Sequence, residues 1–159
     1  MRVDRYEQGW MWASAAMIVA FVATIAHGAF TRSYHPPSHV ETIDPKQVWS
    51  SPSFTPLGVV ERPDGSLEVR VIAHMFAFQK PEIEVPAGRR VTFRLSSVDV
   101  IHGFQIVGTN ANTMVVPGYV SEFTTVFERP GEYLIVCNEY CGLSHHVMHA
   151  KLLVTPRAR

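Results

Sequence analysis

Two patterns of hydrophobic residues divide the chain. From Gln8 to Thr31, "QGWMWASAAMIVAFVATIAHGAFT", apolar and small residues run without a formal charge. A helix over this segment would be about 36 Å long at about 1.5 Å per residue, enough to cross a hydrocarbon core of about 30 Å. From Leu57 onward, short apolar runs alternate with turn residues. The pattern predicts one transmembrane helix followed by a β domain.

The N-terminal segment also has features of a cleavable signal peptide, because small residues lie at Ala26 to Ala29 after a short basic start. Against this alternative, the apolar run from Trp10 to Ala26 exceeds the roughly 7–15 residues of a signal-peptide core. Trp10 and Trp12 also occupy positions typical of aromatic anchors at a membrane surface. We therefore expect a retained, single-pass anchor.

The charges around the anchor predict an orientation. Arg2 and Arg5 precede the span and Arg32 follows it, which favours a cytoplasmic N-terminus in the cell membrane and an outer, periplasmic location for the rest. Residues 33–56 are rich in Pro and Ser without a sustained period, as in a linker. The expected organisation is an anchor over residues 1–32, this linker, and a β domain over residues 57–159.

The β domain is predicted from its alternation and its turns. Pro63-Asp64-Gly65 and Pro86-Ala87-Gly88 each separate two apolar runs and predict hairpins. Alternate apolar positions around the second turn should share one buried face: Ile83, Val85, Val91, Phe93 and Leu95. Five more strand candidates follow, "HGFQIV", "TMVV", "YVSEFTTVF", "EYLIVC" and "AKLLV". Many short strands with short connections favour a mainly β fold, an antiparallel sandwich.

Charge excludes one class of function. The 159 residues include 14 basic and 14 acidic side chains, so the formal net charge is zero, and no basic run is present. Nucleic-acid binding is therefore not expected.

Candidate metal ligands gather near the end of the chain, in "CNEYCGLSHHVM" (Cys137 to Met148). Cys137, Cys141, His145 and Met148 offer thiolate, imidazole and thioether groups, a combination that selects copper or another soft metal. Two cysteines at this spacing could instead form a disulfide in an oxidising compartment, but a disulfide needs neither the histidine nor the methionine.

Zinc is the second alternative for this segment. Cys137, Cys141, His145 and His149 recur every four residues and could form a Cys₂His₂ site on one face of a helix. Gly142 and the strand-like flanks argue against such a helix. A further ligand is expected from a neighbouring strand end, and "SSVDVIHGFQIV" supplies a candidate in His102, although a lone histidine there is more often structural.

These segments together resemble a known family. "SSVDVIHGFQIV", followed by "VVPGYVSEFTTVFERPGEYLIVCNEYCGLSHHVM", is similar to the CuA domain of cytochrome c oxidase subunit II. The family pattern is a remote histidine, then Cys-x-Glu-x-Cys-x-x-x-His-x-x-Met, and every position is filled. The resemblance covers roughly residues 69–154 and implies a cupredoxin-like Greek-key β-sandwich after the anchor helix.

The resemblance implies a dinuclear copper centre. Two thiolates would bridge two copper ions, one histidine would bind each ion, and the methionine and a backbone carbonyl would be weak ligands. The implied ligands are His102, Cys137, Glu139 through its carbonyl oxygen, Cys141, His145 and Met148. His146 and His149 then lie outside the ligand set. Bridging thiolates spread one electron over both ions, which keeps structural change small during electron transfer.

The implied function is electron transfer within a terminal oxidase. Cytochrome c or a small copper protein would deliver single electrons to the copper centre, which would pass them to haem in subunit I, where oxygen is reduced to water. A single membrane helix resembles the short subunit II of B-type haem–copper oxidases. In those short forms the magnesium site that the Glu139 side chain would supply is generally absent.

Two points stay open at the level of sequence. Many relatives have a tryptophan-rich stretch where electrons enter, whereas this chain has Phe76 and Phe78, which could serve that purpose or only form one face of a strand. The alternatives to an oxidase subunit are a CuA subunit of a nitric oxide reductase and a membrane-tethered copper carrier.

Overall fold

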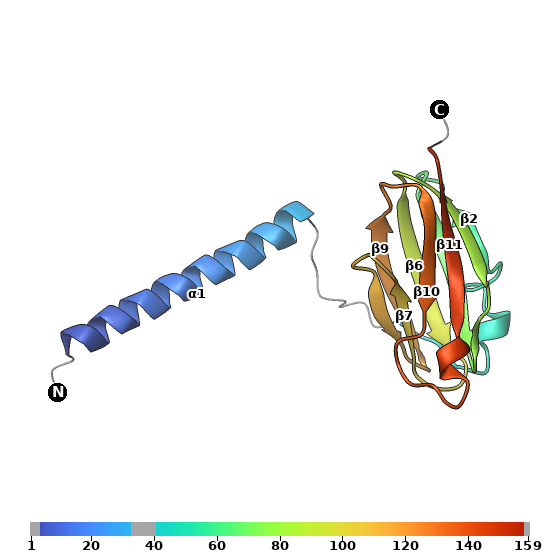
Figure 1. Ribbon diagram of the computed structural model, residues 1–159, viewed down its shortest axis with the longest axis horizontal. Helices are drawn as coiled ribbons and strands as arrows, with labels where there is room; N and C mark the ends of the chain where they lie inside the picture. The colour runs from blue at the N-terminus through green and yellow to red at the C-terminus, as the bar shows by residue number, and fades with distance from the viewer. Residues whose placement is uncertain (1–3, 33–40, 158–159) are drawn as a thin grey trace. The chain divides into compact units, whose positions relative to one another are not determined.

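The first structural unit is one long helix. The computed structural model describes residues 4–32 and 41–157, and the chain divides into two compact units, Met1–Ser38 and His39–Arg159. In the first unit, α1 (Arg5–Arg32) is one continuous helix (Figure 1). Its apolar side chains, such as Ile18 and Phe21, are exposed. By length and composition, Arg5–Phe30 could cross a membrane. The expected apolar helix is therefore present.

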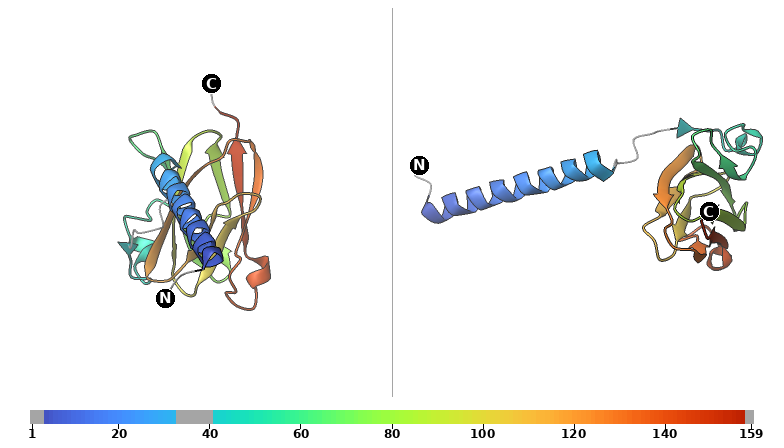
Figure 2. Two further views of the ribbon diagram at one scale, coloured as in Figure 1. Left: turned by 90° about the vertical axis from the view of Figure 1, so that its left-hand side faces the viewer. Right: turned by 90° about the horizontal axis from the view of Figure 1, so that it is seen from above.

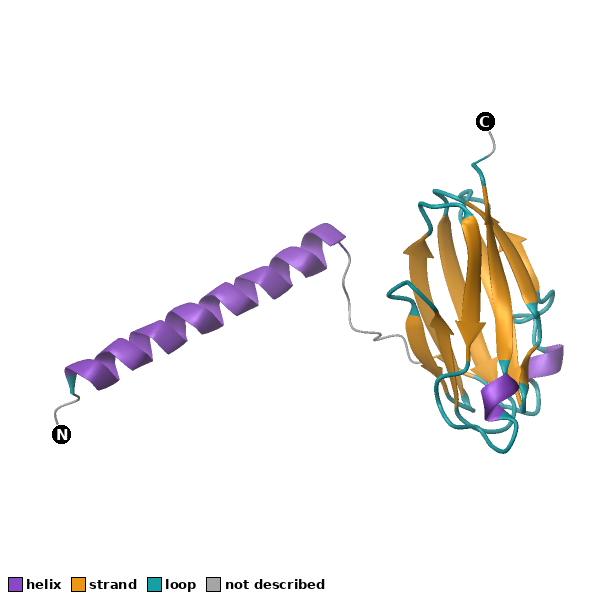
Figure 3. Cartoon of the chain, viewed as in Figure 1, coloured by secondary structure: helices purple, strands orange, loops and turns teal. Residues whose placement is uncertain are grey.

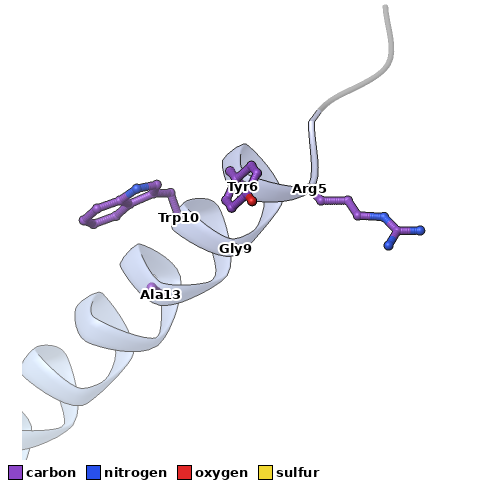
Figure 4. A pocket seen from close by; sticks show the side chains of 5 residues that line it. All are labelled: Arg5, Tyr6, Gly9, Trp10 and Ala13. Atoms are coloured by element: carbon purple, nitrogen blue, oxygen red, sulfur yellow. The ribbon is translucent and has the colours of Figure 1, made fainter.

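Aromatic side chains mark the start of α1. A shallow depression there is lined by Arg5, Tyr6, Gly9, Trp10 and Ala13 (Figure 4). Tyr6 and Trp10 project from successive turns, and Gly9, which has no side chain, leaves the surface open between them. Exposed aromatic rings at a helix end are typical of the boundary between membrane and water.

The second unit is a sandwich of two sheets, whose layers can be followed in Figures 2 and 3. One sheet has the strand order β1-β9-β6-β3-β2, with β4 paired to β3, and the other has the order β5-β11-β10-β7-β8. The strands are β1 (Glu41–Thr42), β2 (Gly58–Glu61), β3 (Leu67–His74), β4 (Ala77–Phe78), β5 (Glu82–Pro86), β6 (Arg90–Ser97), β7 (His102–Ile106), β8 (Asn112–Val115), β9 (Tyr119–Val126), β10 (Gly131–Val136) and β11 (His149–Thr155). The mainly β, cupredoxin-like sandwich is confirmed, and all five later strand candidates form.

The core lies between the two sheets, where the predicted alternation places it. The five positions that were expected to share a buried face are at most 2% exposed: Ile83, Val85, Val91, Phe93 and Leu95. Phe93 packs against Phe104 of the opposite sheet with ring centroids 5.7 Å apart. Burial of these side chains stabilises the frame by roughly 1.5–3 kcal/mol each.

One of the two predicted hairpins is wrong. β2 and β3 do pair across Gly65, but β5 and β6 lie in different sheets, since β5 pairs with β11 and β6 pairs with β3 and β9. The N–H of Ala87 donates to the carbonyl of Thr155, and that of Gly88 to the carbonyl of Phe127. Two strands in facing sheets show the same alternation of apolar residues as two strands of one hairpin, so the pattern could not distinguish the two arrangements. The β3–β6 and β5–β11 pairs are parallel, which also departs from a purely antiparallel sandwich.

The expected linker contains packed residues. β1 pairs with β9, and a short 3₁₀ helix, η1 (Val48–Ser50), follows. Val48 and Phe54 are at most 1% exposed and pack with Ile72 on the outer side of the sheet. Residues 41–56 therefore belong to the β unit, while residues 33–40 lie outside the described part of the chain. The Pro and Ser content concealed two buried apolar side chains.

A buried carboxylate on β3 joins the strand to the turn after β2 and, through Arg70, to the segment before β2. Glu68 on β3 is 6% exposed and accepts hydrogen bonds from Arg62 and, at 2.5 Å, from Arg70. Arg70 also donates to the carbonyl of Thr55 at 2.8 Å, which ties the preceding segment to the sheet. Burial acts to raise the pKa of Glu68, but the hydrogen bonds from Arg70 and Arg62 outweigh it and hold that pKa below the ordinary value of 4.5.

We predict that Glu68→Gln lowers the free energy of unfolding by about 1–3 kcal/mol, because two guanidinium groups lose a charged acceptor. The exposed Glu84→Gln on β5 should change it by less than about 0.5 kcal/mol. Since the folded pKa of Glu68 is lowered, its contribution is present above pH 4.5 and is lost as the pH falls through the folded pKa. Urea unfolding at pH 7 and at pH 3 measures this. Equal effects of the two variants at pH 7 would contradict it.

Candidate metal centre

The strand ladder fixes both ends of the loop that holds the motif. β10 and β11 are antiparallel, with Val136 opposite His149, and the loop between them lies at the end of the sandwich where β11 begins (Figure 1). The N–H of Cys137 donates to the carbonyl of Met148 at 3.2 Å, which closes the base of the loop. The loop is therefore anchored at its first and last candidate ligands.

Three sulfur atoms meet inside this loop. The Sγ atoms of Cys137 and Cys141 are 3.8 Å apart, and the Sδ of Met148 lies 3.7 Å from Cys141 Sγ. All three side chains are at most 6% exposed. A disulfide would require about 2.05 Å, so both cysteines are free thiols in this structure. The disulfide considered from the sequence does not form in this structure.

Each thiol faces its own imidazole. His102, at the start of β7 and fully buried, places Nδ1 3.9 Å from Cys137 Sγ. His145, in the short 3₁₀ helix η2 (His145–Val147), places Nδ1 3.5 Å from Cys141 Sγ. The carbonyl oxygen of Glu139 lies 3.2 Å from Cys137 Sγ. The structure thus brings all six sequence-predicted ligands together around the sulfur pair.

The remaining histidines of the loop stay outside the cluster. His146 and His149 are exposed, and Nδ1 of His149 lies 2.9 Å from the carbonyl of Val147. Between Cys137 and His149, all of which is described, the only helical segment is η2. The helical Cys₂His₂ face that a zinc site would need does not form.

Burial controls the protonation of the thiols. Burial, followed by the neighbouring Cys137 thiol, raises the pKa of Cys141 to about 11. This thiol is protonated at neutral pH, so a metal ion must displace its proton on binding. Two thiols, two imidazole nitrogens and a thioether form a soft donor set of the kind that copper prefers.

Two residues around His102 were missed by the sequence reasoning. Asp99 precedes His102 by three residues, and its Oδ1 lies 2.8 Å from His102 Nε2. Burial acts to raise the pKa of Asp99, but hydrogen bonds from His102 and from the N–H groups of Met75 and Val100 hold it below the usual value. The Asp-Val-Ile-His spacing was a usable signal.

Gly103 is the second missed residue, and it allows the ligand loop to approach β7. A Cβ at this position would lie 2.8 Å from the backbone nitrogens of both Asn138 and Glu139, and 1.9 Å from Asn138 Oδ1. A Cβ atom does not approach backbone atoms that closely, so only glycine fits. The close approach brings Cys137 within reach of His102.

The two candidate aromatic residues for electron uptake lie in different places. Phe78 is 3% exposed and packs edge to face on Phe104 at 5.3 Å, as a core residue. Phe76 is half-buried and lies against Gly142 of the ligand loop, where a Cβ would come within 2.8 Å of its ring. Phe76 therefore touches the loop that carries the candidate ligands.

We predict that Gly103→Ala separates the ligand loop from His102. The variant should lose about 1–3 kcal/mol of stability and bind copper at least about tenfold more weakly. Adding Asn138→Ala should not restore binding, because the two backbone nitrogens remain in the way. Thermal unfolding and copper titration measure both effects. Wild-type copper affinity in Gly103→Ala would contradict the prediction.

Comparison with known proteins agrees with this geometry. The family model "Cytochrome C oxidase subunit II, periplasmic domain" matches residues 68–154. Cytochrome c oxidase subunit 2 of Thermus thermophilus is 41% identical over 156 residues, covering 94% of this chain and 91% of that protein. A second T. thermophilus sequence of the same description is 40% identical over 136 residues, which cover 79% of this chain and 98% of that sequence.

A solved structure matches over the same extent. A chain of a haem–copper terminal oxidase dimer, determined by cryo-electron microscopy, superposes with a TM-score of 0.75 at 29% identity, covering 94% of this chain and 99% of that one. The family match and the donor set both imply copper. The relatives, the shared fold and the six gathered candidate ligands lead to one conclusion: this chain belongs to the cytochrome c oxidase subunit II family.

Proposed function

We propose that this chain is the subunit through which electrons enter a haem–copper terminal oxidase, and that it holds a dinuclear copper centre. The observation that carries the proposal is the pair of buried thiols 3.8 Å apart, each facing the Nδ1 of a different imidazole. A carrier of one labile ion would not need two such half-sites. The pairing supports two ions bridged by both sulfurs.

Each ligand has a distinct role in this proposal. Cys137 and Cys141 would be the bridging thiolates, with His102 and His145 on separate ions. Met148 Sδ and the carbonyl of Glu139, which lie beside the two sulfurs, would be the weak ligands. When bound, the copper centre supplies one-electron acceptance with little structural change. The chain's contribution is to hold all six donors nearly still and to exclude water from the sulfur atoms.

Asp99 is the carboxylate that contacts a ligand side chain, and both of its oxygens already accept hydrogen bonds. The thiols and imidazole nitrogens face one another across the site. This arrangement supports electron transfer, with oxygen reduction carried out by subunit I.

Apolar side chains surround the buried ligands on the surface. Tyr140, Leu143 and Val147 alternate with the ligands of the loop and are 76%, 89% and 54% exposed. Met75, beside Gly142, and Ile101, next to His102, are also exposed. We call these five residues the apolar rim. Large exposed apolar groups mark interaction sites, so the rim would receive the electron donor, cytochrome c or a small copper protein, and face subunit I. Phe76, under the rim, would be the aromatic contact for electron uptake.

The orientation of the anchor completes the proposal. Arg5 lies at the start of α1 and the aromatic side chains of Tyr6 and Trp10 follow it. A cytoplasmic N-terminus in the cell membrane would place the β unit on the outer side, as the family description "periplasmic domain" also suggests. Electrons would then arrive from a donor outside the cell membrane.

We predict opposite outcomes for a bridging and a weak ligand. Cys141→Ser should abolish binding of the second copper, because one bridge is lost. Met148→Leu should keep both ions and shift the reduction potential, because a thioether is a weak ligand. Metal analysis and a redox titration separate these outcomes. Two coppers with an unchanged spectrum in Cys141→Ser would refute the bridge.

We predict that donor binding depends on apolar contacts more than on charge. Leu143→Asp should raise the KM for the donor about tenfold with little change in kcat, because the rim loses one exposed apolar group and gains a charge. Raising the salt concentration from about 50 to 200 mM should change the wild-type rate little. Stopped-flow reduction by the donor measures both. A rate that falls steeply with salt would favour an ionic interface.

A further inference from the structure

One carboxylate joins two elements that lie beside the candidate ligands. Asp99, in the loop between β6 and β7, accepts a hydrogen bond from the N–H of Met75 at Oδ2 (2.6 Å). Its other oxygen, Oδ1, accepts from the N–H of Val100 (2.6 Å) and the hydroxyl of Ser97 (3.2 Å) and lies 2.8 Å from Nε2 of His102. Both oxygens are therefore engaged, and each faces a different element.

The hydrogen bond to Oδ1 determines the tautomer of His102. Its ring is fully buried, so water cannot replace the carboxylate as partner of Nε2. An ionised carboxylate only accepts, so Nε2 must carry the proton and Nδ1 must present its lone pair. Nδ1 is the atom that faces Cys137. Asp99 thereby selects the tautomer in which His102 can bind a metal.

The bond to Oδ2 holds the loop that covers the other cysteine. Met75 and Phe76 lie between β3 and β4, and both approach Gly142: a Cβ there would come within 2.8 Å of the Phe76 ring and 3.7 Å of Met75 Sδ. Gly142 directly follows Cys141 in the chain. The hydrogen bond from the Met75 N–H fixes the point at which this covering loop leaves β3.

The second histidine has no equivalent support. His145 is partly exposed and contacts the ring of Tyr140 at a centroid distance of 5.8 Å. Within residues 4–32 and 41–157, no hydrogen bond is formed by its Nε2. The two halves of the sulfur cluster are thus held differently, His102 from within the fold and His145 from the surface.

We propose that Asp99 is a positioning residue that fixes the tautomer of His102 and, with the same carboxylate, holds the Met75–Phe76 loop over Cys141. Through this shared carboxylate, His102 and the Met75–Phe76 loop over Cys141 keep a fixed position relative to each other. The proposal rests on the proposed function for its metal, but its effect on His102 exists in the metal-free protein too. Part of the apolar rim, at Met75, is linked to a ligand by the same two hydrogen bonds.

Asp99→Asn tests the proposal because asparagine has the same shape but only one acceptor oxygen. If the amide nitrogen faces His102, Nε2 becomes the acceptor and the proton moves to Nδ1, which blocks metal binding there. If the amide nitrogen faces Met75 instead, two donors meet and the covering loop is released. In either orientation one of the two elements loses its support.

The first measurement is made on the full-length, metal-free protein in detergent, by ¹⁵N NMR of the histidine rings and by amide hydrogen exchange. We expect the wild type to show the Nε2–H tautomer at His102 and a protected Met75 amide. In Asp99→Asn, either the Nδ1–H tautomer appears or the Met75 amide exchanges at least about tenfold faster. An unchanged tautomer together with unchanged protection would overturn the proposal.

The second measurement follows copper in the loaded protein. Asp99→Asn should bind copper about 10–100-fold more weakly, the range typical when the hydrogen-bond partner of a metal-binding histidine is removed, and should release it correspondingly faster. Pulsed electron paramagnetic resonance should show a changed nitrogen coupling for one imidazole and an unchanged one for the other, since His145 lacks the carboxylate. An unchanged rate of copper release together with unchanged nitrogen couplings for both imidazoles would also overturn the proposal.

Glu84→Gln is the matched control, because it removes one negative charge from an exposed position on β5. It should behave as wild type in all four readouts, and thermal unfolding of Asp99→Asn verifies that the variant is folded. If the wild type bound a single copper, the proposed function would fail, whereas the tautomer and exchange results would still decide the role of Asp99.

Discussion

The structure depends on keeping two buried sulfur atoms 3.8 Å apart without joining them. Burial makes the charged thiolates unfavourable, and the raised pKa of Cys141 expresses that cost. A bound cation would offset it, because it stabilises both thiolates at once. The protein must therefore prepare a site that is unfavourable for its own anions until metal arrives, and the rigid sandwich around the loop makes this arrangement stable.

The frame achieves this by drawing the ligands from elements that cannot move independently. Cys137 and Met148 close the loop at the ends of β10 and β11 through one backbone hydrogen bond. β7 pairs with β10 and places His102 beside the first sulfur, and Gly103 allows the two backbones to approach closely. Asp99 adds a side-chain link from His102 to the loop over Cys141. Because the donors are fixed by strands and their hydrogen bonds, little rearrangement is expected when the charge of the centre changes.

The sequence located the candidate donors of the site better than it located their surroundings. The spacing in "CNEYCGLSHHVM" points to the candidate donors because a single loop carries most of them. The strands were predictable because alternation follows directly from burial of one face. The β5–β6 hairpin was wrong because strands that face each other across a core share that alternation. Val48 and Phe54 were missed because two apolar residues in a polar segment form no periodic pattern. Gly103 was missed because the residues that exclude a side chain there, Asn138 and Glu139, are distant in sequence.

The central claim is that both sulfurs are shared by two metal ions, and the most direct test is copper stoichiometry combined with low-temperature electron paramagnetic resonance of the copper-loaded protein. The account predicts two coppers per chain and one unpaired electron shared equally between them, seen as a seven-line hyperfine pattern. One copper per chain with a four-line pattern, or zinc without a signal, would contradict it.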